Sequence, residues 1–314
     1  MFRFQLKCYI GSGKNPRISQ TYKLHFLQFY CHSSESNSRI ANEEVSFTVS
    51  YLTNTCGFSS EAALSASKYL HFKGPERPDS VVNCLKTCGL SQTEISHVVR
   101  GDPTILGYGV KRIIPKLEFL TSRGASSRDF AAILTSNPSV LGRSLENHVI
   151  PIYNLIRNVV DSDEKAIAVL KRGRNYIFKN DLDSHMGFSI NFLRDNGVPQ
   201  SRIAMLLHTS PQVVGYVGRL EETVVKLKEM GFNPSRYNFI MALMAMNGQS
   251  PSKWRKKLDA YMRWGWTEQE VLGMFKRLPC CMCHSEKKIM AVMDFLVNKV
   301  GWQLSVIATY PHFF

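Results

Sequence analysis

The chain has 314 residues, of which 44% are hydrophobic and 11% aromatic, so it can bury a large core. This composition excludes a disordered tail protein and a small disulfide-stapled protein. The 39 Lys and Arg outnumber the 25 Asp and Glu, and the net charge of +14 favours a polyanionic partner, a targeting peptide, or both.

The N-terminal segment has the composition of an organelle import sequence. Residues 1–34 contain five Lys and Arg and no acidic residue, so a net charge of +9 remains in residues 35–314. A secretory signal is not expected, because His25 and Gln28 interrupt the apolar run Leu24–Cys31. We therefore predict a transit peptide over residues 1–34, followed by a basic folded body.

The compartment is predicted from the leader and the thiols together. The leader is aromatic and modest in serine, which favours a mitochondrion, with the chloroplast as the alternative. Eight Cys without paired spacing are typical of reduced thiols in an organelle matrix. The longest apolar run of the body, Phe239–Met246, has eight residues, so no membrane-spanning helix is expected.

An internal repeat organises the rest of the chain. Glycines followed by helix-start residues recur 32 to 36 residues apart, with one missing near Val160. These glycines are Gly57, Gly89, Gly124, Gly197, Gly231, Gly265 and Gly301. Prolines recur in the same register at Pro103, Pro138, Pro211, Pro279 and Pro311. Two independent landmarks with one period indicate a solenoid.

One repeat can be derived from its residues. Glycine takes the left-handed conformation that ends a helix, and Ser, Thr or Asn caps the next helix. Capping boxes are predicted at Ser91–Glu94 and Thr267–Glu270, with a shorter acid at Ser126–Asp129. Apolar residues between the landmarks keep helical spacing. Each unit is therefore a long helix, a glycine turn, a shorter helix and a single proline-led turn.

These units predict an all-α fold. About seven repeats of 32–36 residues fit the body, each burying the apolar face of its neighbour. We predict one helical-repeat domain over residues 45–314, and not several domains.

Several segments resemble the mitochondrial transcription termination factor (mTERF) family in its plant form. They are residues 102–106 (Asp-Pro-Thr-Ile-Leu) with 110–120, residues 137–141 (Asn-Pro-Ser-Val-Leu) with 144–151, and residues 285–302. The resemblance implies three-helix repeats curled into a half-doughnut, with a basic groove for duplex DNA or RNA. It also implies a role in organelle transcription termination, transcript processing or intron splicing.

Two departures from the family pattern stand out. The unit around residues 174–178 lacks its proline and the preceding glycine, so an irregular third segment is expected there. The chain stops at residues 310–314, where another unit would begin. Solenoids need a polar capping end, so we expect a C-terminal truncation with weakened stability at that end.

Basic residues on the long helices are the candidate nucleic-acid contacts. Lys253, Lys256 and Lys257 have helical spacing, while Trp254, Leu258 and Tyr261 follow another face. Repeated charge on equivalent helices would build a stripe along a phosphate backbone. Any single member could instead be a solvated helix face. The candidates are Arg112, Lys116, Arg123, Arg143, Arg219, Lys226, Lys253, Lys256, Lys257 and Lys287.

Metal and catalytic motifs are weak. Cys280–His284 supplies zinc-ligand types, but Cys84 and Cys88 could complete a site only if the solenoid folded back on itself. Gly11–Lys14 resembles part of a phosphate-binding loop without its first glycine. Metalloprotease, dinucleotide and serine-hydrolase motifs are absent from the sequence. We predict a non-enzymatic monomer without a metal or other cofactor.

Two other classes stay open. Residues 220–234 resemble a pentatricopeptide unit, which reads single-stranded RNA, although the other units do not follow that pattern. A tetratricopeptide-like protein-binding scaffold has a similar period but lacks support from small-residue packing here. The committed interpretation is an organelle protein that binds double-stranded DNA and regulates transcription, with RNA processing or splicing as the alternative.

Overall fold

The computed structural model describes residues 47–173, 177–178 and 182–310, and the predicted leader lies outside this range. Residues 47–54 form the first described helix. The further elements are α2 (Ser60–Ala66), α3 (Glu76–Thr87), α4 (Gln92–Gly101), α5 (Ile105–Tyr108), α6 (Val110–Ser122), α7 (Ser127–Ser136), η1 (Pro138–Gly142), η2 (Leu145–Val149), α8 (Ile150–Val160), α9 (Asp163–Arg172), α10 (Leu182–Asp195), α11 (Gln200–Thr209), η3 (Pro211–Gly215), α12 (Val217–Glu229), α13 (Tyr237–Asn247), α14 (Pro251–Met262), α15 (Glu268–Arg277), η4 (Pro279–Cys283), α16 (Glu286–Asp294), η5 (Phe295–Lys299) and α17 (Leu304–Thr309).

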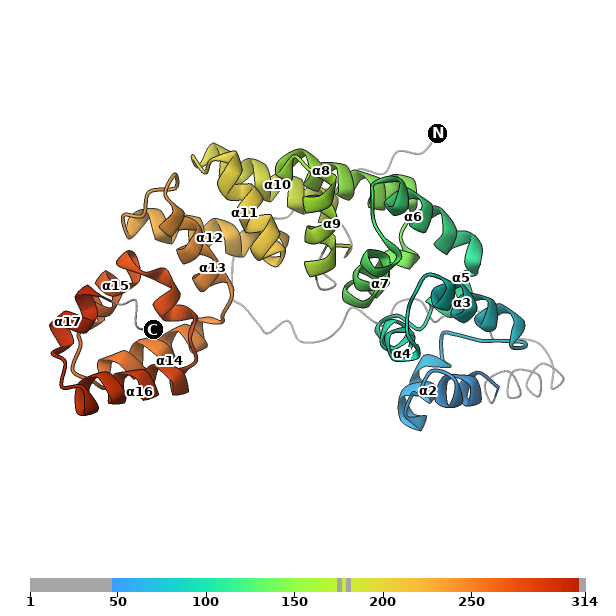
Figure 1. Cartoon of the computed structure of the whole chain (residues 1–314), viewed down its shortest axis with the longest axis horizontal. Helices are drawn as coiled ribbons and strands as arrows, with labels where there is room; N and C mark the ends of the chain where they lie inside the picture. The colour runs from blue at the N-terminus through green and yellow to red at the C-terminus, as the bar shows by residue number, and fades with distance from the viewer. Residues whose placement is uncertain (1–46, 174–176, 179–181, 311–314) are drawn as a thin grey trace, which may run out of the picture. The chain divides into compact units, whose positions relative to one another are not determined.

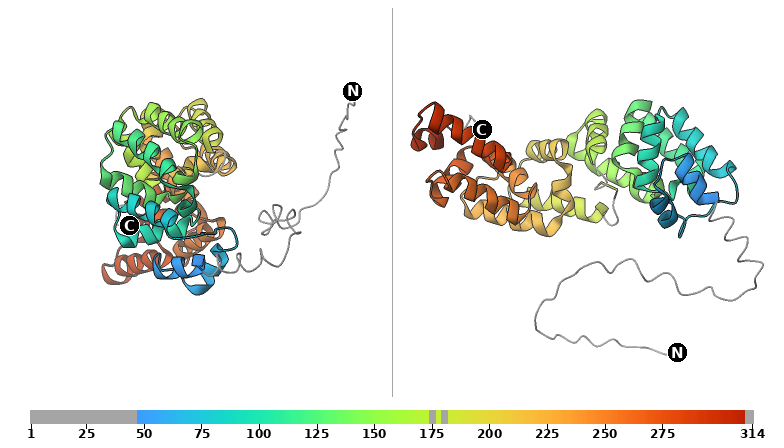
Figure 2. Two further views of the ribbon diagram at one scale, coloured as in Figure 1. Left: turned by 90° about the vertical axis from the view of Figure 1, so that its right-hand side faces the viewer. Right: turned by 90° about the horizontal axis from the view of Figure 1, so that it is seen from below.

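The body is an all-α solenoid of helix pairs. In each pair a first helix is followed by a left-handed turn residue and a second helix, as the sequence predicts (Figure 1). The described residues contain eight pairs, one more than the predicted seven, because residues 47–54 also pair with α2. Figure 2 shows the same succession from two further directions. The described part of the chain holds no strand and no helix suited to crossing a membrane.

The turns between paired helices depend on residues with positive φ. All seven predicted glycines adopt it, with φ between 68° at Gly57 and 97° at Gly265. The turn that lacks a glycine uses Asp161, whose φ is 53°. Only glycine, and less readily Asn or Asp, tolerates this region, so Asp161 fills the gap in the glycine series. The three predicted capping boxes are also present.

The third segment of each unit is a short turn. Tight 3-10 turns begin at Pro138, Pro211 and Pro279, where proline supplies a suitable φ and no N–H is needed. After Pro103 the segment is the single α-turn α5. Most of the irregular third segment predicted around residues 174–178 lies outside the described residues, as does Pro311.

First and second helices form separate contact layers along the chain. First helices contact first helices, as α8, α10 and α12 do in turn, and second helices such as α7, α9 and α11 contact one another. Leucines near the ends of first helices, including Leu85, Leu120 and Leu227, are buried between the layers. Each unit therefore covers an apolar face of the next one.

Polar side chains tie neighbouring units together. Asn137 Nδ2 donates to the carbonyl of Leu170 at 2.8 Å. Arg172 donates to the carbonyl of His208 at 2.7 Å, and Arg277 makes the equivalent bond to Ala308 at 2.7 Å. In both of these arginine contacts, a cation at the end of one second helix caps the carbonyl end of the next.

One tie between units predicts a pH dependence of stability. Lys171 Nζ lies 2.6 Å from Asp129 Oδ1, and its hydrogen bond, with those from Ser126, lowers the pKa of Asp129 to about 2. The ionised carboxylate therefore stabilises the fold above its ordinary pKa, and this contribution is lost as pH falls through about 2. Solvent screens the pair, so we expect roughly 1 kcal/mol.

The check is acid unfolding between pH 5 and 2, roughly the interval over which such a carboxylate protonates. Lys171→Met should flatten the pH dependence of the melting temperature, whereas Lys165→Met, which removes an exposed lysine of the same helix, should leave it as in the wild type. Equal slopes for both variants would contradict the assignment.

Candidate functional site

Seven first helices carry a basic residue at one equivalent place. It lies twelve residues before the left-handed turn residue, or thirteen in the two units whose first helix contains a π turn, η2 or η5. We call this set the basic row. Its members are Arg77, Arg112, His148, His185, Arg219, Lys253 and Lys288.

Burial confirms that these positions are equivalent. The residue after each member packs into the core: Pro78, Ile113, Val149, Met186, Leu220 and Ile289 are buried, and Trp254 is half-buried against the core. The row residues themselves are exposed, except for half-buried His148. The row therefore follows the edge of the apolar face from unit to unit.

The contacts of the row leave most of its charge facing solvent. The Arg112 guanidinium lies 5.0 Å from the ring centre of Tyr108, and Arg219 donates to the carbonyls of Met246 and Gln249. Lys288 Nζ lies 3.3 Å from His284 Nδ1. Within the described residues, no member of the row forms an ion pair with a carboxylate.

The location of the row on its helices favours a bound anion. Each member lies within the first four residues of its helical element. A cation there opposes the helix dipole and costs about 0.3–1 kcal/mol, whereas an anion is attracted by both the side chain and the N–H groups. Seven cationic or titratable groups placed against the dipole suit a chain of phosphates better than they suit stability.

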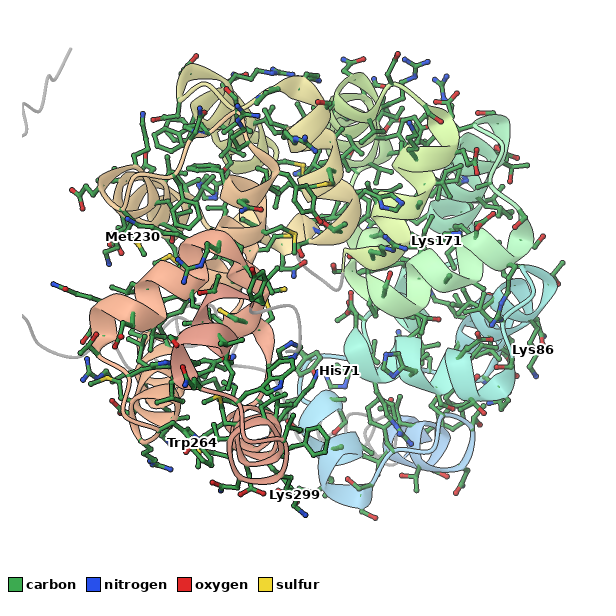
Figure 3. The ribbon with its side chains drawn as sticks, turned by 60° about the vertical axis from the view of Figure 1, so that its left-hand side comes forward. His71, Lys86, Lys171, Met230, Trp264 and Lys299 are labelled. Carbon is green, nitrogen blue, oxygen red and sulfur yellow. The ribbon has the colours of Figure 1, made fainter. Side chains whose placement is uncertain are left out.

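Charges in the second-helix layer are matched internally. Arg128 pairs with Glu94 at 2.8 Å, and Lys171 pairs with Asp129 at 2.6 Å, each joining neighbouring second helices. Lys171 is labelled on this layer in Figure 3. A cleft of about 890 Å³ opens among α4, α7, α9 and α11, but these ion pairs already engage its charges. The basic row is therefore the stronger candidate for a polyanion.

Four of the predicted contact residues map onto or beside the row. Arg112, Arg219 and Lys253 belong to it, and Lys287 precedes its last member, Lys288. Lys226 and Lys256 are exposed on first helices at other positions.

The remaining predicted residues bond within the fold. Lys116 is buried, with 4% exposure, and Lys257 donates to the carbonyl of Met282 at 2.8 Å. Arg143 donates to the carbonyl of Phe178 at 3.0 Å. Arg123 lies over two rings, 5.4 Å from the centre of Phe119 and 5.8 Å from that of Tyr153. These cations also stabilise their own units.

Sequence reasoning missed Arg77, His148, His185 and Lys288. Counting back from each helix-ending residue finds Arg77 and His185 directly. The π turns displace His148 and Lys288 by one residue, and the sequence carries no plain sign of such an insertion.

The cysteine segment is a packed turn. Cys281 is buried in η4, and burial raises the pKa of its thiol far above the ordinary value. Cys84 and Cys88 lie in α3, near the other end of the described body. Across the described residues, no cluster of three His, Cys, Asp or Glu side chains could hold a metal ion.

Comparison with known proteins adds to this geometry. The mTERF family model matches residues 82–246 and 219–314, which include six of the seven row positions. The Arabidopsis thaliana protein "Transcription termination factor MTERF8, chloroplastic" is 19% identical over 273 residues, covering 74% of this chain and 53% of that protein. The chain thus spans about half the length of that curated relative.

Proposed function

The chain belongs to the mTERF family, and from this premise we propose that it binds double-stranded organellar DNA through the basic row to terminate or regulate transcription. The observation that carries the proposal is the repeated cation at the first turn of seven successive first helices. The role is that of a binding protein and not of an enzyme, as at the level of the family.

Phosphate neutralisation is the physical mechanism. Each Arg or Lys of the row that meets a phosphate releases condensed counterions, which favours binding at low salt. Such contacts fix the position of the protein on the duplex but carry no base information. Sequence preference would come from other side chains that reach base edges in a groove.

The test is binding of the full chain to duplex DNA across a salt series, followed by fluorescence anisotropy. Five Arg and Lys of the row predict a log–log slope of about −4.5 at pH 7.5, where histidine is largely neutral. A folded chain that shows no binding, or a slope shallower than about −1, would contradict the proposal and favour a protein-binding scaffold.

An RNA target is the second candidate, and one feature of α10 favours it. Phe188 is 49% exposed and stacks on Phe192, with ring centres 6.3 Å apart and planes 10° apart. Phe188 lies three residues after His185 of the row, so a stacked base and a phosphate could be held together. Tighter binding to single-stranded RNA than to duplex DNA would move the function to transcript processing or splicing.

The location proposed is an organelle, with residues 1–34 as the import leader and residues 45–314 as the binding domain. Family membership and the chloroplast location in the relative's name support an organelle. The acid-free leader supports import. Import of the full chain into isolated mitochondria and chloroplasts, with processing near residue 34, would decide between the two organelles.

A further inference from the structure

A cationic cleft of about 410 Å³ lies between the start of α6 and the start of η2. Lys111, Arg112 and Lys116 line it from α6, and Arg143 lines it just before η2. Gly142 also lines it, and Glu146 is the one carboxylate among its lining residues. Four cations therefore face a single, exposed acid.

Lys116 is the unusual member of this cleft. Its side chain is buried, and Nζ donates to the carbonyl of Arg112 at 2.8 Å. No carboxylate of the described residues lies within ion-pair distance of it. Burial and the neighbouring Arg112 lower the pKa of its ammonium below the usual value. A buried ammonium with one neutral partner is costly unless an anion joins it.

The repeat itself does not require a cation at this place. Counting from the turn residues, the equivalent positions hold Val81 in α3, Ser189 in α10 and Thr223 in α12, which are buried without a charge. The fold accepts apolar or hydroxyl side chains there. Lys116 is thus an addition of this unit, and its cost calls for a ligand.

The backbone at the cleft also suits an anion. Gly109 precedes α6 and offers no side-chain cap, so first-turn N–H groups of α6 lack the cap that Ser144 supplies to η2. The first turns of α6 and η2 both contribute residues to the cleft, and helix N-termini attract negative charge. Side chains and helix ends therefore favour the same charge.

We propose that this cleft is a seat for one phosphate group, held by Lys116 from the buried side and by Arg112 and Arg143 from the rim. In its source the inference rests on the proposed function, because a backbone phosphate would arrive with nucleic acid bound along the row. A free phosphate compound shares the same chemistry, and the two sources are separated by experiment.

The first measurement is thermal unfolding of the full chain with inorganic phosphate as the probe, at ionic strength held constant with chloride. Wild type should gain about 2–4 °C in melting temperature, saturating with phosphate. Lys116→Met should lose this gain, and without phosphate it should melt no lower than the wild type, since it buries no charge. Lys226→Met, which removes an exposed lysine at the C-terminal half of α12, should keep the gain.

The second measurement is competition between inorganic phosphate and duplex DNA at constant ionic strength. A backbone source predicts that phosphate weakens DNA binding to the wild type more than to Lys116→Met. If the saturable gain appears but the chain binds no nucleic acid in the salt series, the seat stands, its phosphate comes from a small molecule, and the proposed function fails. If DNA binds but phosphate acts no more than chloride, the seat is overturned and the proposed function stands.

Discussion

Replacing Arg77, Arg112 and Lys253 together with alanine should lower the affinity for duplex DNA roughly a hundredfold at moderate salt, at about 1 kcal/mol for each lost phosphate contact. The log–log salt slope should become shallower by about 3. The three residues lie on three first helices of the row, so the loss is spread along the binding surface. Anisotropy titrations at several salt concentrations measure both quantities.

A matched control separates the row from net charge. Lys86, Lys165 and Lys299 are exposed and lie outside the row, and two of them, Lys86 and Lys299, are labelled in Figure 3. Their triple alanine variant loses the same charge, yet its affinity should fall by less than about threefold. Equal losses in the two triples would show that only the overall charge matters.

Unfolding is an unlikely confounder for the triple of the row, for a physical reason that can be measured. Each substitution removes a cation from the first turn of a helix, where it opposes the dipole. The melting temperature should therefore not fall by more than the loss of the Arg112 contact with Tyr108 explains. A normal melting temperature with weak binding assigns the loss to the interface.

The fold could be predicted from local signals because each turn is specified by its own residues. The glycine landmarks and the capping boxes act within a few residues of themselves, so the periods seen in the sequence are the periods of the structure. The missing glycine near Val160 was also placed correctly, and Asp161 takes its conformation. The resemblance to the family is confirmed by the match of its model.

The site could be predicted only in part, because it depends on register and on tertiary neighbours. A π turn in η5 moves the row from Lys287 to Lys288, although both are basic and adjacent. Helical spacing placed Lys116 with Arg112 on one face, but only packing against η1 and η2 shows that Lys116 is buried beside the cleft. Periodicity gives the face of a helix and not what covers it.

The conformational role of the turns predicts opposite signs for two glycine substitutions. Gly124 has φ of 89° and no atom within 4 Å of an added Cβ, so Gly124→Ala meets backbone strain alone and should lower the free energy of unfolding by about 1–2 kcal/mol. Gly187, inside α10, also has open space but no positive φ. Gly187→Ala should therefore raise it by about 1 kcal/mol.

Asp161 provides the converse substitution in the same kind of turn. Asp161→Gly removes the strain of φ at 53° and should stabilise the chain by about 0.5–1 kcal/mol, because the exposed contact of Asp161 with Arg157 adds little. Urea unfolding at neutral pH measures all three variants. If both alanine variants change stability in the same direction, helix propensity and not the left-handed turn governs these positions. Opposite signs, with Asp161→Gly on the stabilising side, would show that the residue ending each first helix sets the repeat, and with it the spacing of the basic row.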